Sequence, residues 1–286
     1  MWIAYAFGSA IFAGLTGILA KLGMRNMDSH LATAIRTIVV LFFSWLMVFV
    51  TGAQADISHL TANTIIFLVL SGGATGASWL CYFRALQIGD INKVTPIDKS
   101  STVLTMLLSI LLLGETVSAI KVVCMLLIGG GTYLMIQKKE NQEGQAEQRG
   151  WLLYACGSAV FASLTAILGK VGVQNINSNL GTAIRTIVVL IMAWVIVCMQ
   201  GKQKEIKNID KKDGCFLLLS GIATGASWLC YYRALQMGDV SIVVPIDKLS
   251  ILVTILFSYI VFQETLSKKE WLGLALLVGG TLLLLL

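Results

Sequence analysis

The stretch that decides the fold of this chain occurs twice. It reads Val94-Thr95-Pro96-Ile97-Asp98-Lys99-Ser100-Ser101 in the first half and Val243-Val244-Pro245-Ile246-Asp247-Lys248-Leu249-Ser250 in the second half. The two stretches hold both prolines of the chain, and each places an Asp and a Lys just ahead of a long apolar run. A charge beside so long an apolar run is costly, and inside a membrane it usually marks function.

The composition of the chain is that of a membrane protein. Hydrophobic residues make up 57% of the sequence and charged residues only 13%, whereas a soluble domain carries about 25% charged residues. Apolar runs of about twenty residues recur along the chain, and each can cross a bilayer core of about 30 Å as a helix. The net charge of +6 therefore bears on topology and lipid headgroups. It does not indicate nucleic acid, because no basic patch is interleaved with aromatic residues.

The chain is a tandem duplication, because it matches itself when it is shifted by 149 residues. Residues 33–41 recur at 182–190, and residues 74–82 recur unchanged at 223–231. A constant offset of this kind predicts two copies of one structural unit. The predicted domains are a first repeat at residues 1–137, a polar linker at 138–150 and a second repeat at 151–286.

Each repeat contains five apolar segments. They are expected near 2–22, 31–51, 64–87, 92–113, 119–137, 151–171, 180–200, 214–236, 241–262 and 270–286. Because five is odd, the second repeat must enter the membrane upside down, and inverted repeats are typical of secondary transporters. The expected fold class is therefore an all-α membrane protein, with ten transmembrane helices arranged as two five-helix inverted-topology repeats.

The loops predict the orientation of the chain in the membrane. Lys and Arg are concentrated in the loops that follow odd-numbered segments, and such loops are usually cytoplasmic. Both termini are then outside. The expected location is the cell membrane, as a multi-pass protein of a bacterial inner or plasma membrane.

Eight charged residues are predicted to bind the substrate or to form gates. They are Asp98, Lys99, Asp247, Lys248, Arg36, Arg185, Arg84 and Arg233. Along the predicted path, those of one repeat fall toward one membrane face and those of the other repeat toward the opposite face. In one reading each cluster closes one entrance with ion pairs, and in the other the basic excess recruits an anionic group. The structural alternative is that these are interfacial charges that reach lipid headgroups.

The two prolines, Pro96 and Pro245, mark helix breaks of one of two kinds. Each can occupy the first position of a helix, which would put Asp98 in the first turn, where free backbone N–H groups favour a carboxylate. Alternatively the helix begins earlier and the proline is a kink that frees a backbone carbonyl. Glu115 and Glu264, at the ends of the same segments, are expected to be solvated loop acids.

Other polar and aromatic residues are predicted to line a cavity. Thr105 and Thr254 lie on the helix face that continues from each Asp, where interhelical hydrogen bonding is the alternative to a substrate path. The aromatic candidates are Trp79, Tyr82, Trp228 and Tyr231. These rings either line the cavity or anchor their helices at the membrane interface. The Gly-rich blocks just before them predict close helix packing.

No pattern in the sequence predicts an enzyme. The cysteines show no C-x-x-C spacing, and no metal-ligand spacing, nucleophile–base pair or phosphate-binding loop occurs. We therefore expect no metal and no cofactor. The expected partners are a small-molecule substrate, membrane lipids and coupling protons, with no nucleic acid. The expected functional form is a monomer, with a dimer as the alternative.

The chain resembles the EamA family of the drug/metabolite transporter superfamily over essentially its whole length. The resemblance lies in the Gly-, Ala-, Ser- and Trp-rich third segments and in fourth segments ending Leu113-Gly114-Glu115 and Phe262-Gln263-Glu264. Residues 82–90 and 96–99 look especially like the single-repeat, five-helix members, so that the chain resembles two of them fused. The resemblance implies secondary transport, often export, of small organic metabolites, with the site in a central cavity. In the commoner pattern of the family the proline lies deeper, so site residues of better-known members are not carried over to 96–99.

The sequence therefore predicts a secondary active transporter, working as an exporter of a small organic anion or zwitterion by alternating access. Proton coupling through Asp98 and Asp247 would fit this reading. One alternative is a proton-coupled exporter of organic cations or drugs, in which the aspartates bind the substrate. Another is a non-transporting membrane module that handles lipid or binds partner proteins.

Overall fold

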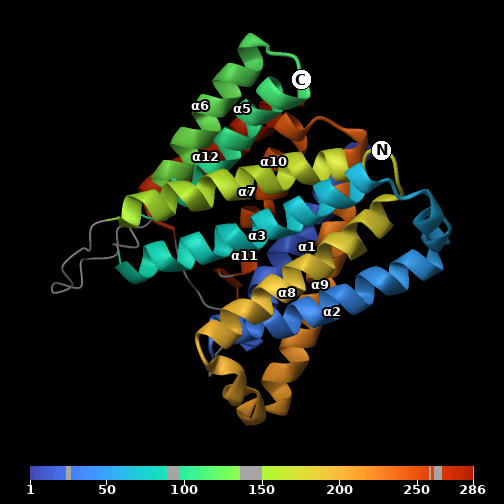
Figure 1. Ribbon diagram of the computed structural model, residues 1–286. Helices are drawn as coiled ribbons and strands as arrows, with labels where there is room; N and C mark the ends of the chain where they lie inside the picture. Colours follow the sequence, from blue (N-terminus) through green and yellow to red (C-terminus); the bar gives the residue numbers. More distant parts are fainter. Residues whose placement is uncertain are drawn as a thin grey trace. The chain divides into compact units, whose positions relative to one another are not determined.

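The protein is helical throughout the part that the computed structural model describes, which is residues 1–23, 27–88, 94, 97–135, 150–257, 259–260 and 266–285. The α-helices of the first repeat are α1 (Trp2–Gly23), α2 (Ser29–Val50), α3 (Ala62–Ile88), α5 (Ser101–Leu113) and α6 (Ala119–Leu134). Those of the second repeat are α7 (Trp151–Val173), α8 (Ser178–Met199), α9 (Lys211–Met237), α10 (Val240–Lys248), α11 (Ser250–Phe257) and α12 (Lys268–Leu283) (Figure 1). Within the described residues, 7 helical segments are long and apolar enough to cross a membrane. The predicted all-α membrane fold is confirmed.

The duplication is visible in small details of the structure. Asp28 caps the N-terminus of α2 and Asn177, at the equivalent position, caps that of α8. Both helices are followed by a short 3-10 helix, η1 (Ala53–His59) and η2 (Lys202–Asn208). The residue before each 3-10 helix is a glycine with a left-handed backbone, Gly52 at φ 70° and Gly201 at φ 69°. Glycine adopts that conformation without steric cost, so both repeats turn the chain in the same way.

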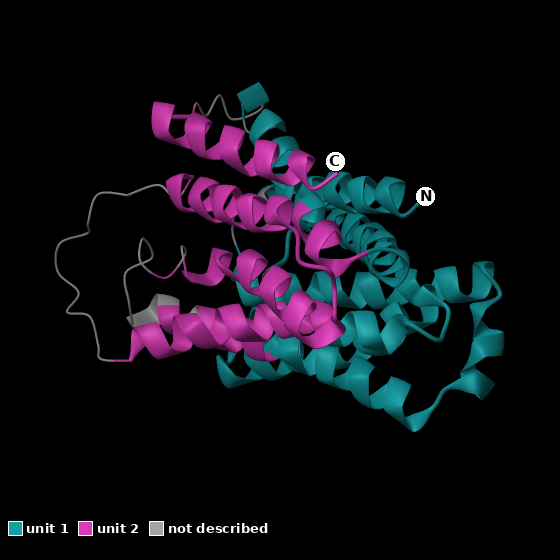
Figure 2. Ribbon diagram, turned by 90° about the horizontal axis from the view of Figure 1, so that it is seen from above, with its two compact units in different colours: residues 1–76, 168–238, 246–264 teal, residues 77–167, 239–245, 265–286 magenta. Residues whose placement is uncertain are grey.

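The described chain forms two compact units that do not coincide with the two repeats. Unit 1 consists of residues 1–76, 168–238 and 246–264, and unit 2 of residues 77–167, 239–245 and 265–286 (Figure 2). Each unit therefore contains segments of both repeats. Residues 136–149, where the polar linker was predicted, lie outside the described residues, so the predicted domain boundaries remain a prediction.

Glycines set the spacing of the helices within unit 1, where α1 packs on α9 and α2 packs on both α8 and α9. A Cβ added at Gly72 of α3 would come within 2.8 Å of the Arg185 carbonyl oxygen of α8. At the equivalent Gly221 of α9, a Cβ would come within 3.0 Å of the Arg36 carbonyl oxygen of α2. These close approaches confirm the packing role that the Gly-rich blocks predicted.

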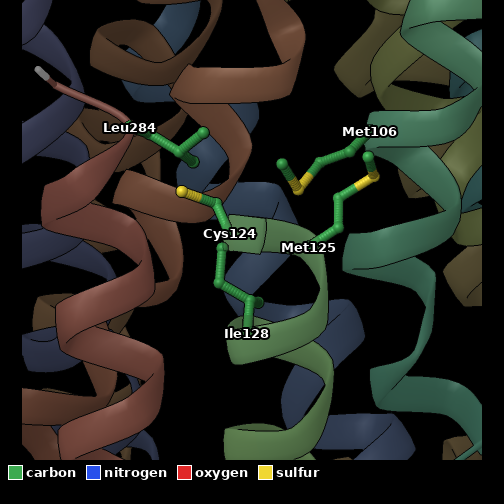
Figure 3. Close-up of a cluster of buried hydrophobic side chains, with 5 residues drawn as sticks. All are labelled: Met106, Cys124, Met125, Ile128 and Leu284. Atoms are coloured by element: carbon green, nitrogen blue, oxygen red, sulfur yellow. The ribbon is translucent and has the colours of Figure 1, made fainter. Parts of the chain in front are cut away.

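Unit 2 is built around the pair α6 and α12, which also cross at glycines. A Cβ at Gly131 would come within 2.6 Å of the Gly273 carbonyl oxygen. A buried apolar cluster lies beside this pair and consists of Met106, Cys124, Met125, Ile128 and Leu284. Figure 3 shows the two methionines next to each other and the Cys124 side chain directed toward Leu284. This cluster fixes α5 and α6 to the C-terminal end of α12.

The fourth apolar segment of each repeat is interrupted, although the sequence suggested single segments at 92–113 and 241–262. In the second repeat α10 ends at Lys248 and α11 begins at Ser250, while the Leu249 N–H bonds to the Ile246 carbonyl at 2.9 Å. In the first repeat the Ser100 N–H bonds to the Ile97 carbonyl at 3.2 Å, and Ser100 directly precedes α5. The tighter i to i−3 bonds break the α-helical ladder at equivalent positions.

The structure decides between the two interpretations of the second proline. Pro245 lies inside α10, which begins at Val240, so the interpretation as first residue of a helix is wrong and the proline is a kink. Pro96 lies outside the described residues. Asp98 lies before Ser100, the N-cap residue of α5, and is therefore not in the first turn of that helix.

Candidate functional site

Asp247, close to the C-terminal end of α10, is the centre of a polar cluster within unit 1. Its Oδ1 accepts a hydrogen bond from the Ser9 hydroxyl of α1 at 2.5 Å. Ser9 Oγ also lies 3.2 Å from Ser227 Oγ of α9, and Ser227 Oγ donates to the Ser9 carbonyl at 3.1 Å. Both serines are fully or nearly fully buried, whereas Asp247 is half-buried. A short hydrogen bond from a hydroxyl to a carboxylate is a strong one, so Ser9 fixes the direction of the Asp247 side chain.

Asp98 is the centre of an equivalent cluster within unit 2. Its Oδ1 accepts a hydrogen bond from the Ser158 hydroxyl of α7 at 2.6 Å. Ser158 Oγ lies 3.3 Å from Ser78 Oγ of α3, and Ser78 Oγ donates to the Ser158 carbonyl at 3.1 Å. Shifted by 149 residues, these are the three residues of the first cluster, joined by the same kinds of contact. We call the two sets the Asp247 triad (Ser9, Ser227, Asp247) and the Asp98 triad (Ser78, Ser158, Asp98).

The sequence analysis named the two aspartates and missed the four serines. A signal was present, because Ser9 and Ser158 stand in the repeated Gly-Ser-Ala segments and Ser78 and Ser227 in the block that recurs unchanged. A small hydroxyl among small apolar residues indicates helix packing as readily as a carboxylate contact. The contacts also run between repeats, whereas the sequence analysis grouped the charges within each repeat.

Arg185 is the most buried of the predicted site residues and lies within unit 1, with 1% of its surface exposed. From α8 its Nη2 donates to Thr75 Oγ1 at 2.8 Å and its Nε to Ser71 Oγ at 3.4 Å, both on α3. On α9, the Trp228 ring centroid lies 5.0 Å from the guanidinium carbon and that of Tyr232 lies 4.5 Å from it. The cation is thus held by hydroxyl groups and by two aromatic faces.

Arg36, the counterpart of Arg185, is half-buried in the same unit and has a different environment. Its Nη2 donates to Thr224 Oγ1 of α9 at 2.9 Å, and Thr224 Oγ1 lies 3.3 Å from Thr16 Oγ1 of α1. Its Nε is buried and has no hydrogen-bond partner among the described residues. Both arginines therefore lie on hydroxyl groups of the other repeat, and Arg185 is in addition flanked by two aromatic rings.

Four other predicted charges are exposed side chains, namely Lys99, Lys248, Arg84 and Arg233. Arg233 Nη1 donates to Gln236 Oε1 at 2.6 Å, and Gln236 Nε2 donates to two carbonyl oxygens near the end of α7. These positions are compatible with headgroup contacts as well as with gates, and their predicted roles remain predictions.

The predicted cavity residues lie in two kinds of environment. Trp79, Tyr82, Trp228 and Tyr231 are all half-buried. Tyr82 packs on a small cluster that contains Ala85 and Ala155, within unit 2. The Thr105 hydroxyl donates to the Ser101 carbonyl at 2.7 Å and that of Thr254 to the Ser250 carbonyl at 3.2 Å. Each threonine hydroxyl therefore bonds back to its own helix, and Thr105 is in addition nearly fully buried.

Glu115 is a site residue that the sequence analysis placed wrongly. Its Oε1 and Oε2 accept hydrogen bonds from the Val240 and Ser241 N–H groups at 2.6 and 3.0 Å, within unit 2. The side chain is thus a cap on the N-terminus of α10, where free N–H groups and the helix dipole favour a carboxylate. Beside it, Lys121 Nζ lies 3.5 Å from Asp239 Oδ2. Glu264, the equivalent of Glu115, lies outside the described residues.

The chemistry available in these clusters is electrostatic and hydrogen-bonding. The two triads offer carboxylates held by serine hydroxyls, and the two arginines offer cations inside apolar segments. Within the described residues no group of three or more His, Cys, Asp or Glu side chains could hold a metal ion.

The sequence that carries these clusters matches a known protein family. The family model of the EamA-like transporters matches residues 1–137 and 149–286. The chain belongs to the EamA-like transporter family. The predicted resemblance is confirmed, and the protein is an integral membrane protein of a family of transporters with a two-repeat architecture.

Three relatives illustrate how this EamA-like chain is related to others. An uncharacterized transporter in the cobO 3' region of a Sinorhizobium species is 46% identical over 136 residues, which cover 48% of this chain and 96% of that protein. The probable 4-amino-4-deoxy-L-arabinose-phosphoundecaprenol flippase subunit ArnE of Pseudomonas fluorescens is 32% identical over 76 residues. These residues cover 27% of this chain and 67% of that protein. A chain of known crystal structure aligns with 100% of this chain and 98% of its own length, with a TM-score of 0.74. Because the two sequences are only 18% identical, this likeness shows the fold alone. The first relative thus corresponds, over nearly its whole length, to about half of this chain.

Proposed function

We propose that this protein is a secondary transporter that exports a small organic anion or zwitterion across the cell membrane by alternating access. The observation that carries the proposal is the pair of equivalent triads, in which Asp247 bonds to Ser9 and Asp98 bonds to Ser158. Each triad joins an aspartate of one repeat to a serine on the first helix of the other. Two equivalent sites of this kind are expected in a protein whose repeats exchange conformations.

In this proposal, the interrupted fourth segment of the second repeat is the part of the chain that changes conformation. Asp247 lies between the Pro245 kink and the break at Leu249, so the carboxylate stands where the helix is least regular. The chain also passes from unit 2 to unit 1 between Pro245 and Ile246. A small change of backbone angles there would move Asp247 relative to Ser9. We propose that forming and breaking this hydrogen bond accompanies the opening of one side.

Proton coupling is the proposed role of the two aspartates. A carboxylate that is held by one hydroxyl in one state and released in the other has two different affinities for a proton. The names of two relatives, a transporter and a flippase subunit, support movement of a small molecule. We further propose that the termini are outside and that the functional form is a monomer, as the sequence predicts.

The proposal is tested by measuring charge movement in proteoliposomes on a solid-supported membrane. The compounds are L-glutamate, L-alanine, glucose 6-phosphate and the cation tetraphenylphosphonium. We expect a current with an anion or the zwitterion, and its loss in the double variant Asp98→Asn, Asp247→Asn. Asp210→Asn is the matched control, because Asp210 is exposed at the start of α9 and makes no capping bond. Its current should equal that of the wild type.

Two results would count against the proposal. A current with the cation alone would favour the exporter of organic cations in its place. Currents that are unchanged in the double aspartate variant would remove the triads from the mechanism. If no compound produces a current or a thermal shift, the non-transporting module becomes the better reading.

A further inference from the structure

We propose that Arg185 binds the anionic group of the substrate and that Arg36, its counterpart in the first repeat, does not. This inference rests on the proposed transport function and adds to it a single binding site and a chemical class of ligand. The class is an organic oxyanion, with a carboxylate or a phosphate as the recognised group. All the residues that carry the inference lie within unit 1.

The first observation is a buried cation with neutral partners. Arg185 is 1% exposed, and no carboxylate of the described residues forms an ion pair with it. Its described partners are the hydroxyls of Ser71 and Thr75 and the rings of Trp228 and Tyr232. A buried guanidinium is poorly compensated by neutral groups alone, because most of its hydration is lost. An anion brought by the substrate would supply the missing charge.

The second observation is that the guanidinium is held in a fixed direction. Ser71 and Thr75 are one turn apart on α3, and Trp228 and Tyr232 are one turn apart on α9. A planar guanidinium whose face is covered by rings presents its N–H groups in one plane. Such a fork matches the two oxygens of a carboxylate or phosphate, and the pairing is stronger than with a single point charge. The site is therefore organised before the ligand binds.

The third observation is the difference between the two repeats. Arg36 is half-buried, whereas Arg185 is only 1% exposed and has two rings over it. Its hydroxyl partner, Thr224, continues to Thr16 and so links α2, α9 and α1. In the sequence, the position equivalent to Tyr232 is Phe83. The first repeat thus lacks the phenol group that the second repeat places over its arginine, and Arg36 is better suited to joining helices.

The position of Asp247 links this anion site to the coupling proposal. Ser227 of the Asp247 triad directly precedes Trp228, whose ring lies over the Arg185 guanidinium, so the acid and the cation are linked through α9. The same helix continues to Tyr231 and Tyr232. The two rings stand edge to face, with centroids 5.2 Å apart. An oxyanion on Arg185 and a proton on Asp247 would therefore influence each other.

The test is ligand binding to the purified full chain in lipid nanodiscs, measured by isothermal titration. L-Glutamate probes carboxylate recognition, and glucose 6-phosphate probes phosphate recognition. We expect one of them to bind and Arg185→Gln to weaken it by about tenfold or more, as expected for loss of a charge-assisted hydrogen bond. Arg36→Gln, the matched variant, should change the affinity by less than about threefold, because Arg36 bonds to the Thr224 hydroxyl and is not proposed to contact the ligand.

Two further variants keep the test decisive if Arg185→Gln does not fold, which size-exclusion chromatography will show. Arg185→Lys retains the charge but loses the fork, and Thr75→Val removes the hydroxyl on Nη2. Each should weaken binding of the anion severalfold while the purified chain keeps the size-exclusion profile and the melting temperature of the wild type. A merely structural role would instead lower the melting temperature together with the affinity.

The outcomes separate this inference from the proposed function. Equal losses in Arg185→Gln and Arg36→Gln, or unchanged affinity in Arg185→Gln, would overturn the assignment of Arg185 while leaving transport intact. Transport of the cation by a wild type that binds neither anion would also overturn it. A wild type that produces no current and binds none of the compounds would overturn both proposals.

Discussion

At the scale of single residues, the candidate site consists of a few polar groups that are held inside apolar helices. Each aspartate meets a serine whose own hydroxyl lies close to that of a second serine, and each intramembrane arginine meets threonine. Charged groups are costly at such depth unless they are hydrogen-bonded. Hydroxyl groups satisfy part of that need without neutralising the charge.

Replacing Ser9 by Ala tests the role of the Asp247 triad. The change removes the donor that lies 2.5 Å from Asp247 Oδ1 and leaves the helix backbone intact. A hydrogen bond to a charged group contributes about 1.5–3 kcal/mol, so the transport rate should fall by about tenfold or more. Ser158→Ala should have a similar effect, because Ser158 has the same role at Asp98. The rate is measured from solid-supported membrane currents.

The control for these variants is Ser58→Ala. Ser58 is exposed in η1 and its hydroxyl donates to the Ala55 carbonyl, away from both triads. Its transport rate should match that of the wild type. Normal rates in Ser9→Ala and Ser158→Ala would show that these hydrogen bonds do not contribute to transport.

At the scale of helices, the sequence was informative wherever the signal was local. The apolar runs predicted the helices, and the 149-residue offset predicted two copies of one structural unit, in which equivalent residues prove to cap equivalent helices. The break at Leu249 was harder to predict, because it depends on a kink four residues earlier and on i to i−3 bonds. The serines of the triads could not be assigned, because their role depends on which helix of the other repeat packs beside them.

The close approach of α3 and α8 predicts that Gly72→Ala disturbs the Arg185 site. The new Cβ would lie 2.7 Å from Val188 Cβ and 2.8 Å from the Arg185 carbonyl oxygen. Relieving such a clash in a packed interior costs about 1–3 kcal/mol. We expect a lower melting temperature and weaker anion binding, measured by thermal unfolding and titration.

Gly73→Ala is the matched control, because a Cβ there meets nothing within 4 Å. Alanine is also the better helix former, so this variant should be as stable as the wild type or slightly more stable. Equal melting temperatures for the two variants would contradict the close packing of α3 on α8.

The cap on α10 predicts that Glu115→Ala destabilises the protein. The change leaves the Val240 and Ser241 N–H groups without the carboxylate that accepts from them. Loss of a helix cap costs about 0.5–2 kcal/mol, which lowers the melting temperature by a few degrees. Glu205→Ala is the comparison, since Glu205 forms a half-exposed ion pair with Lys202 that should contribute little. Equal melting temperatures for Glu115→Ala and Glu205→Ala would show that the Glu115 cap does not stabilise the protein.

At the scale of the whole molecule, the contacts of the site cross between repeats. Unit 1 contains the Asp247 triad and both arginines, and unit 2 contains the Asp98 triad and the Glu115 cap. In both triads a residue of one repeat depends on a residue of the other. A single repeat would therefore not hold a complete triad by itself.

The measurement that tests the central claim most directly is the accessibility of the two triads from the two sides of the membrane. Ala13 and Ala162 are equivalent, half-buried residues that lie one turn after Ser9 and Ser158 on the same helix faces. Each is replaced by Cys in a chain without other cysteines. Labelling with a membrane-impermeant maleimide is then compared in right-side-out and inside-out vesicles.

Alternating access predicts that the two cysteines are labelled from opposite sides. It also predicts that substrate raises labelling at one position while it lowers labelling at the other. Labelling of both positions from the same side, or labelling that substrate does not change, would contradict alternating access in this protein.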